Sequence, residues 1–330
     1  MKVKIFVPSN ISCFFSIYYD KNILKSGSCG VGILLDNGVI TTVKKNSKDF
    51  NSSKDFNSSN NFNSSNNTNT YNDSYFKDYI SYKTLNYFKD NFDLDISKIA
   101  IEHKFNVPIA SGFGTSSAMA TGVSIAINKL FDLNLSKLEL FQIAHIVEVE
   151  SGTGLGDVIS QSSKGIVIKD KPGIVDFNNV SNILHKVNNE ANNEVNNESN
   201  IEDINEIFVV TKTIGEIDTS SIIQNPNISK KINDLGKIAI KSFLKDKSIE
   251  NLMDVSINFA NNTNLINDEL RKIIDVMGKN NNRYSLGSSM AMLGNTAFAL
   301  TKFPEDFIEN SDLEDVLISK IDINGVKILK

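Results

Sequence analysis

The stretch Pro108-Ile-Ala-Ser-Gly-Phe-Gly-Thr-Ser-Ser-Ala118 decides the fold of this chain. It follows an apolar, β-branched segment at 98–105 that predicts a strand, and it leads into an Ala-, Ile- and Val-rich segment at 115–131 that predicts a helix. Gly112 and Gly114 permit a close backbone approach and φ values that other residues rarely adopt. The sequence therefore predicts a strand, a tight glycine loop and a helix in succession.

Hydroxyl groups gather where this predicted helix begins, at Thr115, Ser116 and Ser117. A helix N-terminus carries free N–H donors and the positive end of the helix dipole, so it favours phosphate. A hydroxyl at that place can also bind Mg²⁺, which prefers oxygen. The loop is not a Walker A loop, because no Lys follows Gly114, and it lacks the dinucleotide pattern GxGxxG. A tight turn with Ser and Thr capping a helix is the alternative.

An acidic segment follows the loop. Residues 136–149 predict a second helix, which opens with Ser and Glu in capping-box spacing. His145 and Glu148 share one face of that helix, whereas Glu150 lies on another. The run Ser151-Gly-Thr-Gly-Leu-Gly-Asp157 then bends the chain and places Asp157 on the next turn. A carboxylate near a magnesium-bound nucleotide can accept or orient a substrate hydroxyl. Taken singly, each residue also fits a solvated, capping or structural role.

The composition limits the class of protein. The 330 residues are 40% hydrophobic and carry a net charge of −5, which gives no sign of a nucleic-acid binder. Two cysteines without a CxxC pair and three scattered histidines do not suit a Cys/His zinc site. Few cysteines, no signal peptide and no long apolar run lead us to expect a cytoplasmic protein without a membrane span.

Two Asn-rich segments interrupt the predicted elements, at about 46–74 and about 186–205. Their composition offers too few apolar groups to offset the entropy of ordering, so we expect disordered excursions, either without function or binding a partner. Asp36-Asn37-Gly38 predicts a hairpin between strands at 30–35 and 39–43. Strands dominate the early part of the chain, and helices precede a last strand at 321–329. The pattern predicts a two-layer α+β protein.

The loop at 108–118 resembles the second conserved motif of the GHMP kinases, PxxxGLGSSAA, with Phe113, Thr115 and Ser117 as departures. The resemblance implies ATP and Mg²⁺ as cofactors and makes Ser116 a magnesium ligand. It also implies that the following residues wrap the ATP phosphates: Ser111, Gly112, Phe113, Gly114, Thr115, Ser116 and Ser117.

The acidic segment resembles the same family. Mevalonate-type GHMP kinases carry a helix Glu that binds Mg²⁺, followed by an Asp that faces the substrate hydroxyl. The resemblance assigns these roles to Glu148, with Glu150 as the competitor, and to Asp157 as the catalytic residue. The spacing from Glu148 to Asp157 departs slightly from the mevalonate kinase pattern.

The opening of the chain and three further segments resemble the archaeal pantoate kinase branch of this family, and one of the three, at 148–158, resembles EVENGTGLGDV. The opening Phe6-Val-Pro-Ser-Asn-Ile-Ser-Cys-Phe-Phe15 resembles APGHITGFF, with Asn10 where many GHMP kinases carry Lys. The segment at 25–32, from Lys25 through Ser28, resembles a glycine-rich segment of the branch, and the segment at 289–298 resembles SMAMLGNTVFA. Asn10, Lys25 and Ser28 become candidates for binding substrate, and a basic group or backbone N–H groups at 25–32 would meet a substrate carboxylate.

The resemblance implies a ribosomal protein S5 domain 2-like N-terminal domain at 1–185, a linking segment at 186–205 and a ferredoxin-like domain at 206–330. It implies a kinase that phosphorylates the 4-hydroxyl of pantoate in coenzyme A biosynthesis, and a homodimer is conceivable from relatives. Two alternatives stay open. One is another GHMP kinase, acting on mevalonate, homoserine or a sugar, and the other is a non-catalytic nucleotide-binding sensor.

Overall fold

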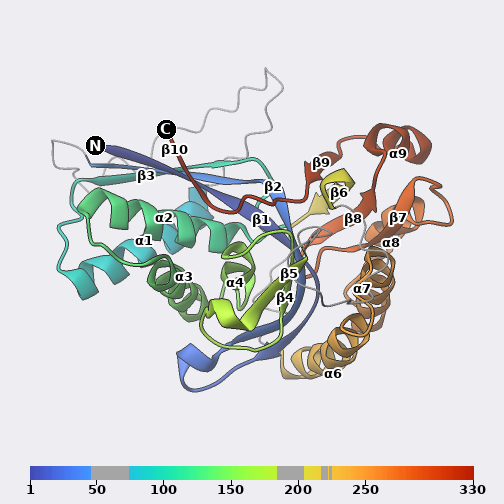
Figure 1. Ribbon diagram of the computed structural model, residues 1–330, viewed down its shortest axis with the longest axis horizontal. Coiled ribbons are helices and arrows are strands. Elements are labelled where there is room, and N and C mark those ends of the chain that lie inside the picture. Colours follow the sequence, from blue (N-terminus) through green and yellow to red (C-terminus); the bar gives the residue numbers. More distant parts are fainter. Residues whose placement is uncertain (46–73, 184–203, 217–221, 223–224) are drawn as a thin grey trace, which may run out of the picture.

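The computed structural model describes residues 1–45, 74–183, 204–216, 222 and 225–330, and these build two β-sheets with flanking helices (Figure 1). The first sheet has the strand order β10-β1-β2-β4-β5, with β3 also paired to β2, and the second has the order β7-β8-β6-β9. The α+β class predicted from the sequence is confirmed. The strands are β1 (Lys2–Tyr18), β2 (Gly27–Lys45), β3 (Ile99–Phe105), β4 (Ile166–Lys169), β5 (Val180–Ile183), β6 (Phe208–Gly215), β7 (Ser285–Met290), β8 (Asn295–Thr301), β9 (Leu317–Lys320) and β10 (Lys327–Leu329).

The predicted hairpin at Asp36-Asn37-Gly38 is wrong, because β2 continues through it. β1 pairs with both halves of β2, and the register shifts between Pro8, opposite Gly38, and Ser9, opposite Leu35. The two extra residues form a bulge. Their side chains bind the second sheet: Asp36 Oδ1 accepts the N–H of Lys320 at 2.8 Å, and Asn37 Nδ2 donates to Ser319 Oγ at 3.0 Å.

The predicted strand at 321–329 is wrong in its bounds, because within this range only Lys327–Leu329 form a strand and Ile321 makes an isolated bridge to Leu35. The C-terminal segment contributes β9 to the second sheet and β10 to the first, where Ile328 pairs with Ile5 of β1. The last strand of the chain thus lies beside the first (Figure 1). Residues 206–330 therefore contain one strand of the first sheet besides the whole second sheet.

Three helices lie together on one side of the long strands β1 and β2 (Figure 1): α1 (Ser74–Phe92), α2 (Thr115–Phe131) and α3 (Lys137–Ser151). Most of α2 is buried, since apolar or small residues occupy every face of it. Gly122 lets α2 approach β2, because a Cβ there would lie 2.3 Å from Thr41 Oγ1. Ser136 and Glu139 form the predicted capping box of α3.

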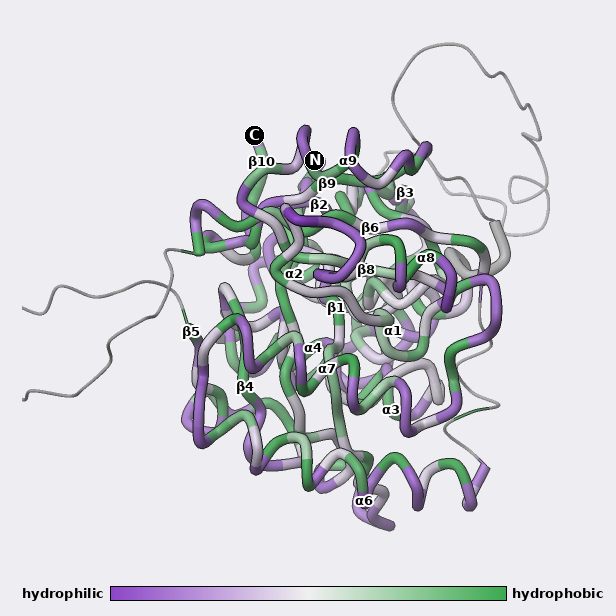
Figure 2. Tube along the Cα trace, turned by 90° about the vertical axis from the view of Figure 1, so that its right-hand side faces the viewer, coloured by the Kyte–Doolittle hydropathy of each residue, from purple (hydrophilic) through white to green (hydrophobic). Residues whose placement is uncertain are grey.

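The later helices are α6 (Pro226–Phe243), α7 (Ile249–Thr263), α8 (Asp268–Met277) and the short α9 (Pro304–Ser311). Both α6 and α7 pack on β1, whereas α8 packs on β7 and β8. Polar and apolar residues alternate along α6 at the edge of the molecule (Figure 2). Phe14 of β1 packs edge-to-face on Phe243 and Phe259 at centroid distances of 5.9 and 6.4 Å. One apolar core therefore joins β1 to α6 and α7.

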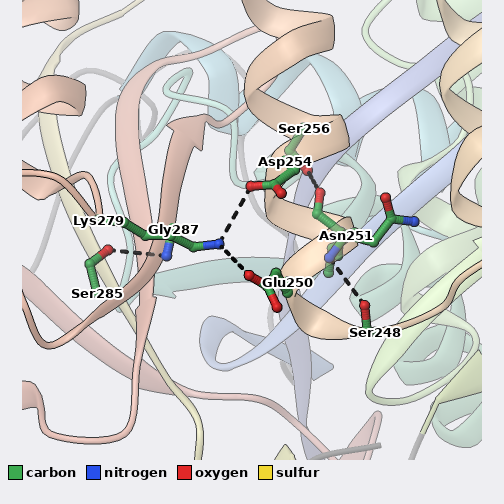
Figure 3. Close-up of polar contacts among 9 residues, drawn as sticks. Ser248, Glu250, Asn251, Asp254, Ser256, Lys279, Ser285 and Gly287 are labelled. Atoms are coloured by element: carbon green, nitrogen blue, oxygen red, sulfur yellow. Dashed lines mark hydrogen bonds and ion pairs between the residues drawn. The ribbon is translucent and has the colours of Figure 1, made fainter. Parts of the chain in front are cut away.

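An exposed ion pair ties α7 to the segment after α8. Lys279 Nζ lies 3.5 Å from both Glu250 Oε1 and Asp254 Oδ1 (Figure 3). Such solvent-exposed pairs add about 0.2–1 kcal/mol, so the cluster is a minor part of the packing of β7 on α7.

Both Asn-rich segments fall outside the described residues, apart from the one or two residues at their C-terminal ends. Over the described ranges, none of the helices combines the length and apolar character needed to cross a membrane.

Candidate active site

The loop between β3 and α2 presents its backbone at the start of a helix. Gly112 and Gly114 adopt φ values of 93° and 61°, and Ala110 also has a positive φ of 54°. Gly114 is the N-cap of α2, and no side chain caps the helix there. The N–H groups of the first turn have no intrahelical acceptor, so they are free to bind an anion. The loop has the geometry of the predicted phosphate site.

The side chains of Phe113 and Ser111 hold the loop against the rest of the protein. Phe113 is buried in the core, and its carbonyl accepts the N–H of Asn10 at 3.1 Å. The Ser111 hydroxyl lies 2.8 Å from Ile109 O and 3.2 Å from Gly215 O. Thr115 is buried, whereas Ser116 is only partly buried. A ligand above the loop can therefore be met by the backbone N–H groups and by the partly exposed hydroxyl of Ser116.

Glu148 of α3 lies under the first turn of α2. Its Oε1 accepts hydrogen bonds from Ser116 Oγ, at 2.8 Å, and from Ser117 Oγ. The side chain is fully buried, and Oε2 has no hydrogen-bond partner among the described residues. Burial, and to a lesser extent the nearby Asp157 carboxylate, raise the pKa of Glu148 to about 7. Glu150, the competing residue, is exposed.

Asp157 is the first residue of the short helix α4 (Asp157–Gln161), which the sequence predicted only as a turn. Its Oδ1 accepts hydrogen bonds from Asn10 Nδ2 at 2.7 Å and from Ser12 Oγ at 3.4 Å. Burial raises the pKa of Asp157, while Lys169 and these two donors lower it. A Cβ at Gly114 would lie 3.1 Å from Asp157 Cβ, so the carboxylate and the phosphate loop are in direct contact.

Lys169, at the end of β4, is a site residue that the sequence did not reveal. It is 2% exposed, and its Nζ donates to Gly156 O at 3.1 Å and to Ser28 Oγ at 3.3 Å. Burial lowers the pKa of Lys169, and the carboxylates of Asp157 and Glu148 oppose that change. Its one sequence signal is a lysine at the end of a four-residue strand that is otherwise apolar. A lysine at the end of an apolar strand is just as typical of a solvent-exposed side chain.

The glycine-rich segment at 25–32, whose backbone N–H groups we expected to meet a substrate carboxylate, is strand from Gly27 onward and forms the first part of β2. Ser28 still belongs to the site through Lys169 and Gly156. Lys25 is exposed at the end of a one-turn helix (Ile23–Lys25), and it lines a surface pocket that contains none of the site residues above. The Nε2 atom of His145 lies 3.0 Å from the carbonyl oxygen of Ser26.

The residues present fit an ATP–magnesium pair. Oxygen ligands stand at Ser116 Oγ and at the unpartnered Glu148 Oε2, and Mg²⁺ in kinases is typically held by one or two carboxylates together with substrate phosphates. A Cβ at Gly154 would lie 2.5 Å from Glu148 Oε1, so glycine keeps space open beside that carboxylate. In the described ranges, no cluster of three or more His, Cys, Asp or Glu forms a metal cage built by protein alone.

Comparison with known proteins identifies the family of this chain. Residues 79–165 match the GHMP kinases N terminal domain. The chain is 32% identical to a pantoate kinase of Methanocaldococcus jannaschii, over 90% of this chain and 92% of the relative, and 27% identical to one of Methanospirillum hungatei, over 93% and 90%. A solved phosphotransferase related to the CoA biosynthesis pathway superposes with a TM-score of 0.73 at 23% identity, covering 100% and 99% of the two chains. This chain therefore belongs to the GHMP kinases and, among them, to the pantoate kinase family.

Proposed function

We propose that this enzyme transfers the γ-phosphoryl group of ATP to the 4-hydroxyl of pantoate, which gives 4-phosphopantoate for coenzyme A biosynthesis. The relatives that cover nine-tenths of the chain carry the name pantoate kinase, which supports the substrate. The observation that carries the reaction is the contact between Gly114, at the phosphate-binding helix end, and Asp157. A hydroxyl held by Asp157 would lie beside the phosphate that it attacks.

The loop residues Ser111–Ser117 would cradle the ATP phosphates through the free N–H groups at the start of α2. Ser116 and Glu148 would hold Mg²⁺, which neutralises charge on the phosphates. Ser117 holds Glu148 through Oε1 and so leaves Oε2 for the metal. Catalysis by positioning and charge stabilisation suits this small set of groups.

Asp157 would orient the 4-hydroxyl of pantoate and accept its proton as the oxygen bonds to the γ-phosphorus. The bond between that phosphorus and the β,γ-bridging oxygen breaks, and ADP leaves with the bridging oxygen. Asn10 and Ser12 both donate to Oδ1, so within the described residues Oδ2 is left to face the substrate. Asn10 thus serves substrate binding through Asp157, and it replaces the cationic partner of other GHMP kinases by a neutral donor.

The carboxylate of pantoate needs a cation or several N–H donors. Lys169 and Ser28 lie together beside Gly156, one residue before Asp157, and they support a carboxylate site at that place. Lys25 is three residues from Ser28 and exposed, so its role in binding substrate stays a prediction. We also expect a cytoplasmic enzyme, and light scattering in solution would test the homodimer.

The test is ATP consumption with Mg²⁺ and pantoate, run in parallel with mevalonate and homoserine, with the product identified by mass. We expect pantoate-dependent turnover that yields 4-phosphopantoate. Turnover of mevalonate or homoserine, but not of pantoate, would show that the enzyme acts on a different substrate. Binding of ATP without turnover of any of the three would favour a nucleotide-binding sensor over an enzyme.

A further inference from the structure

A threonine of the second sheet contacts the first peptide of the phosphate loop. Thr296 of β8 is fully buried, and its hydroxyl donates to the carbonyl of Ser111 at 2.8 Å. Ser111 opens the loop, directly before Gly112. The contact joins residues 185 positions apart, and it links β8 to the peptide that begins the phosphate site.

The direction of the hydrogen bonds at Thr296 follows from its single hydroxyl proton. That proton is used on Ser111 O, since a carbonyl can only accept. Thr213 Oγ1, on β6, lies 2.8 Å from Thr296 Oγ1, so Thr213 must be the donor of this second bond. Thr213 and Thr296 are directly paired in the β6–β8 register. A chain of two hydroxyls therefore runs from the second sheet to the loop.

The turn before β8 packs on the same loop. A Cβ on Gly294 would lie 2.1 Å from Ser111 O and 2.5 Å from Gly112 Cα, so the two backbones touch. The N–H of Met292 donates to Ser12 O at 2.9 Å, and the Ser12 hydroxyl reaches Asp157. The β7–β8 hairpin thus contacts both the phosphate loop and a residue that holds the catalytic carboxylate.

We propose that Thr296 is a positioning residue, whose hydroxyl fixes the Ser111–Gly112 peptide and thereby aims the free N–H groups of the loop at the ATP phosphates. The inference rests on the proposed function in so far as the loop binds ATP. Without the hydroxyl, the Ser111 carbonyl loses its buried donor, and the peptide can rotate about Gly112, whose φ of 93° is little restrained by a side chain.

The substitution Thr296→Val removes the hydroxyl and keeps the shape. Thr301→Val is a matched control on the same strand, because Thr301 is also fully buried, donates to a carbonyl (Tyr284 O) at 2.8 Å and accepts one further bond, from the N–H of Phe303. Both variants should lose similar stability in a thermal melt. Only Thr296→Val should weaken binding of Mg·ADP, by about tenfold, and raise the KM for ATP to match, while the KM for pantoate stays unchanged.

Calorimetric titration with Mg·ADP tests the positioning role of Thr296 without any turnover. The test therefore remains valid if pantoate is not the substrate. Equal nucleotide affinity in the two Val variants would overturn the proposal. Thr296→Ser keeps the hydroxyl and should restore affinity to within about twofold, whereas failure of Ser to restore it would assign the effect to packing. If Thr296→Val does not fold, Thr213→Val, at a partly buried position, should still raise the dissociation constant about threefold, and no rise would refute the hydroxyl chain.

Discussion

Glu148→Gln should make the nucleotide-free protein more stable while it disables the enzyme. The carboxyl of Glu148 is fully buried, and Gln can still accept the hydrogen bonds of Ser116 and Ser117 through Oε1. The substitution removes the charge without removing these bonds. Because stability and activity should move in opposite directions, the variant separates a structural role of Glu148 from a role in binding a cation.

The magnitude follows from the pKa. Burial, with help from the Asp157 carboxylate, raises the pKa of Glu148 from 4.5 to about 7. A difference of about 2.5 corresponds to roughly 3 kcal/mol, since one pKa unit is worth about 1.4 kcal/mol. The folded protein binds more protons than the unfolded chain between pH 4.5 and 7, so wild-type stability falls as the pH rises through this window. Gln does not titrate, so the Glu148→Gln variant does not lose stability across this pH window.

Urea denaturation without Mg²⁺ or nucleotide, at pH 5 and pH 8, measures the effect. We expect Glu148→Gln to gain roughly 3 kcal/mol over wild type at pH 8 and less than about 1 kcal/mol at pH 5. Glu150→Gln, at the exposed residue two positions on, is the control and should change stability by less than about 0.5 kcal/mol at either pH. If the stability gain of Glu148→Gln is absent, or equal at both pH values, the reasoning is refuted. Turnover of Glu148→Gln with saturating pantoate should fall about 100-fold.

The other predictions concern the neighbours of Glu148. Asp157→Asn should keep Mg·ATP affinity in a binding titration and lower kcat by about 10²–10⁴, and near wild-type kcat would remove Asp157 from its role. Lys169→Met removes the cation that lowers the pKa of Asp157, so the acid limb of the kcat–pH profile should move to higher pH. Gly114→Ala forces a side chain onto a φ of 61°, at a cost of about 1–2 kcal/mol, and places Cβ 3.1 Å from Asp157 Cβ. We expect it to weaken ATP binding, measured by calorimetry.

The parts of the site that the sequence predicted are those encoded locally. The bounds of α2, 115–131, were predicted without error, because a glycine N-cap and a run of small and apolar residues both lie within the segment itself. The capping box at Ser136 is equally local. The resemblance to the GHMP kinases, which rests on the loop, the helix Glu and Asp157 in this order, predicted that the three lie in one site. In the structure Ser116 donates to Glu148, and Gly114 packs against Asp157.

Lys169 and the β2 bulge could not be predicted because both depend on distant strands. Lys169 is buried because β4 pairs with β2 and because Gly156 leaves room for its side chain, since a Cβ at Gly156 would lie 2.8 Å from Lys169 Nζ. Asp36-Asn37-Gly38 has the composition of a hairpin turn, yet β1 is long enough to pair with both halves of β2. The polar side chains then bind the backbone of β9, a contact that no pattern near residue 36 indicates.

The buried charges of the site have a common consequence. Glu148, Asp157 and Lys169 come from three separate elements and, when all three are ionised, carry two negative charges against one positive. One carboxylate is therefore left without a cationic partner in a buried place, which costs the free protein stability at neutral pH. A fold selected for stability alone would do better with Gln at position 148. We propose that the unpartnered Oε2 of Glu148 is an oxygen held in advance for a cation, whose binding would recover the free energy that burial of the carboxylate costs the free protein.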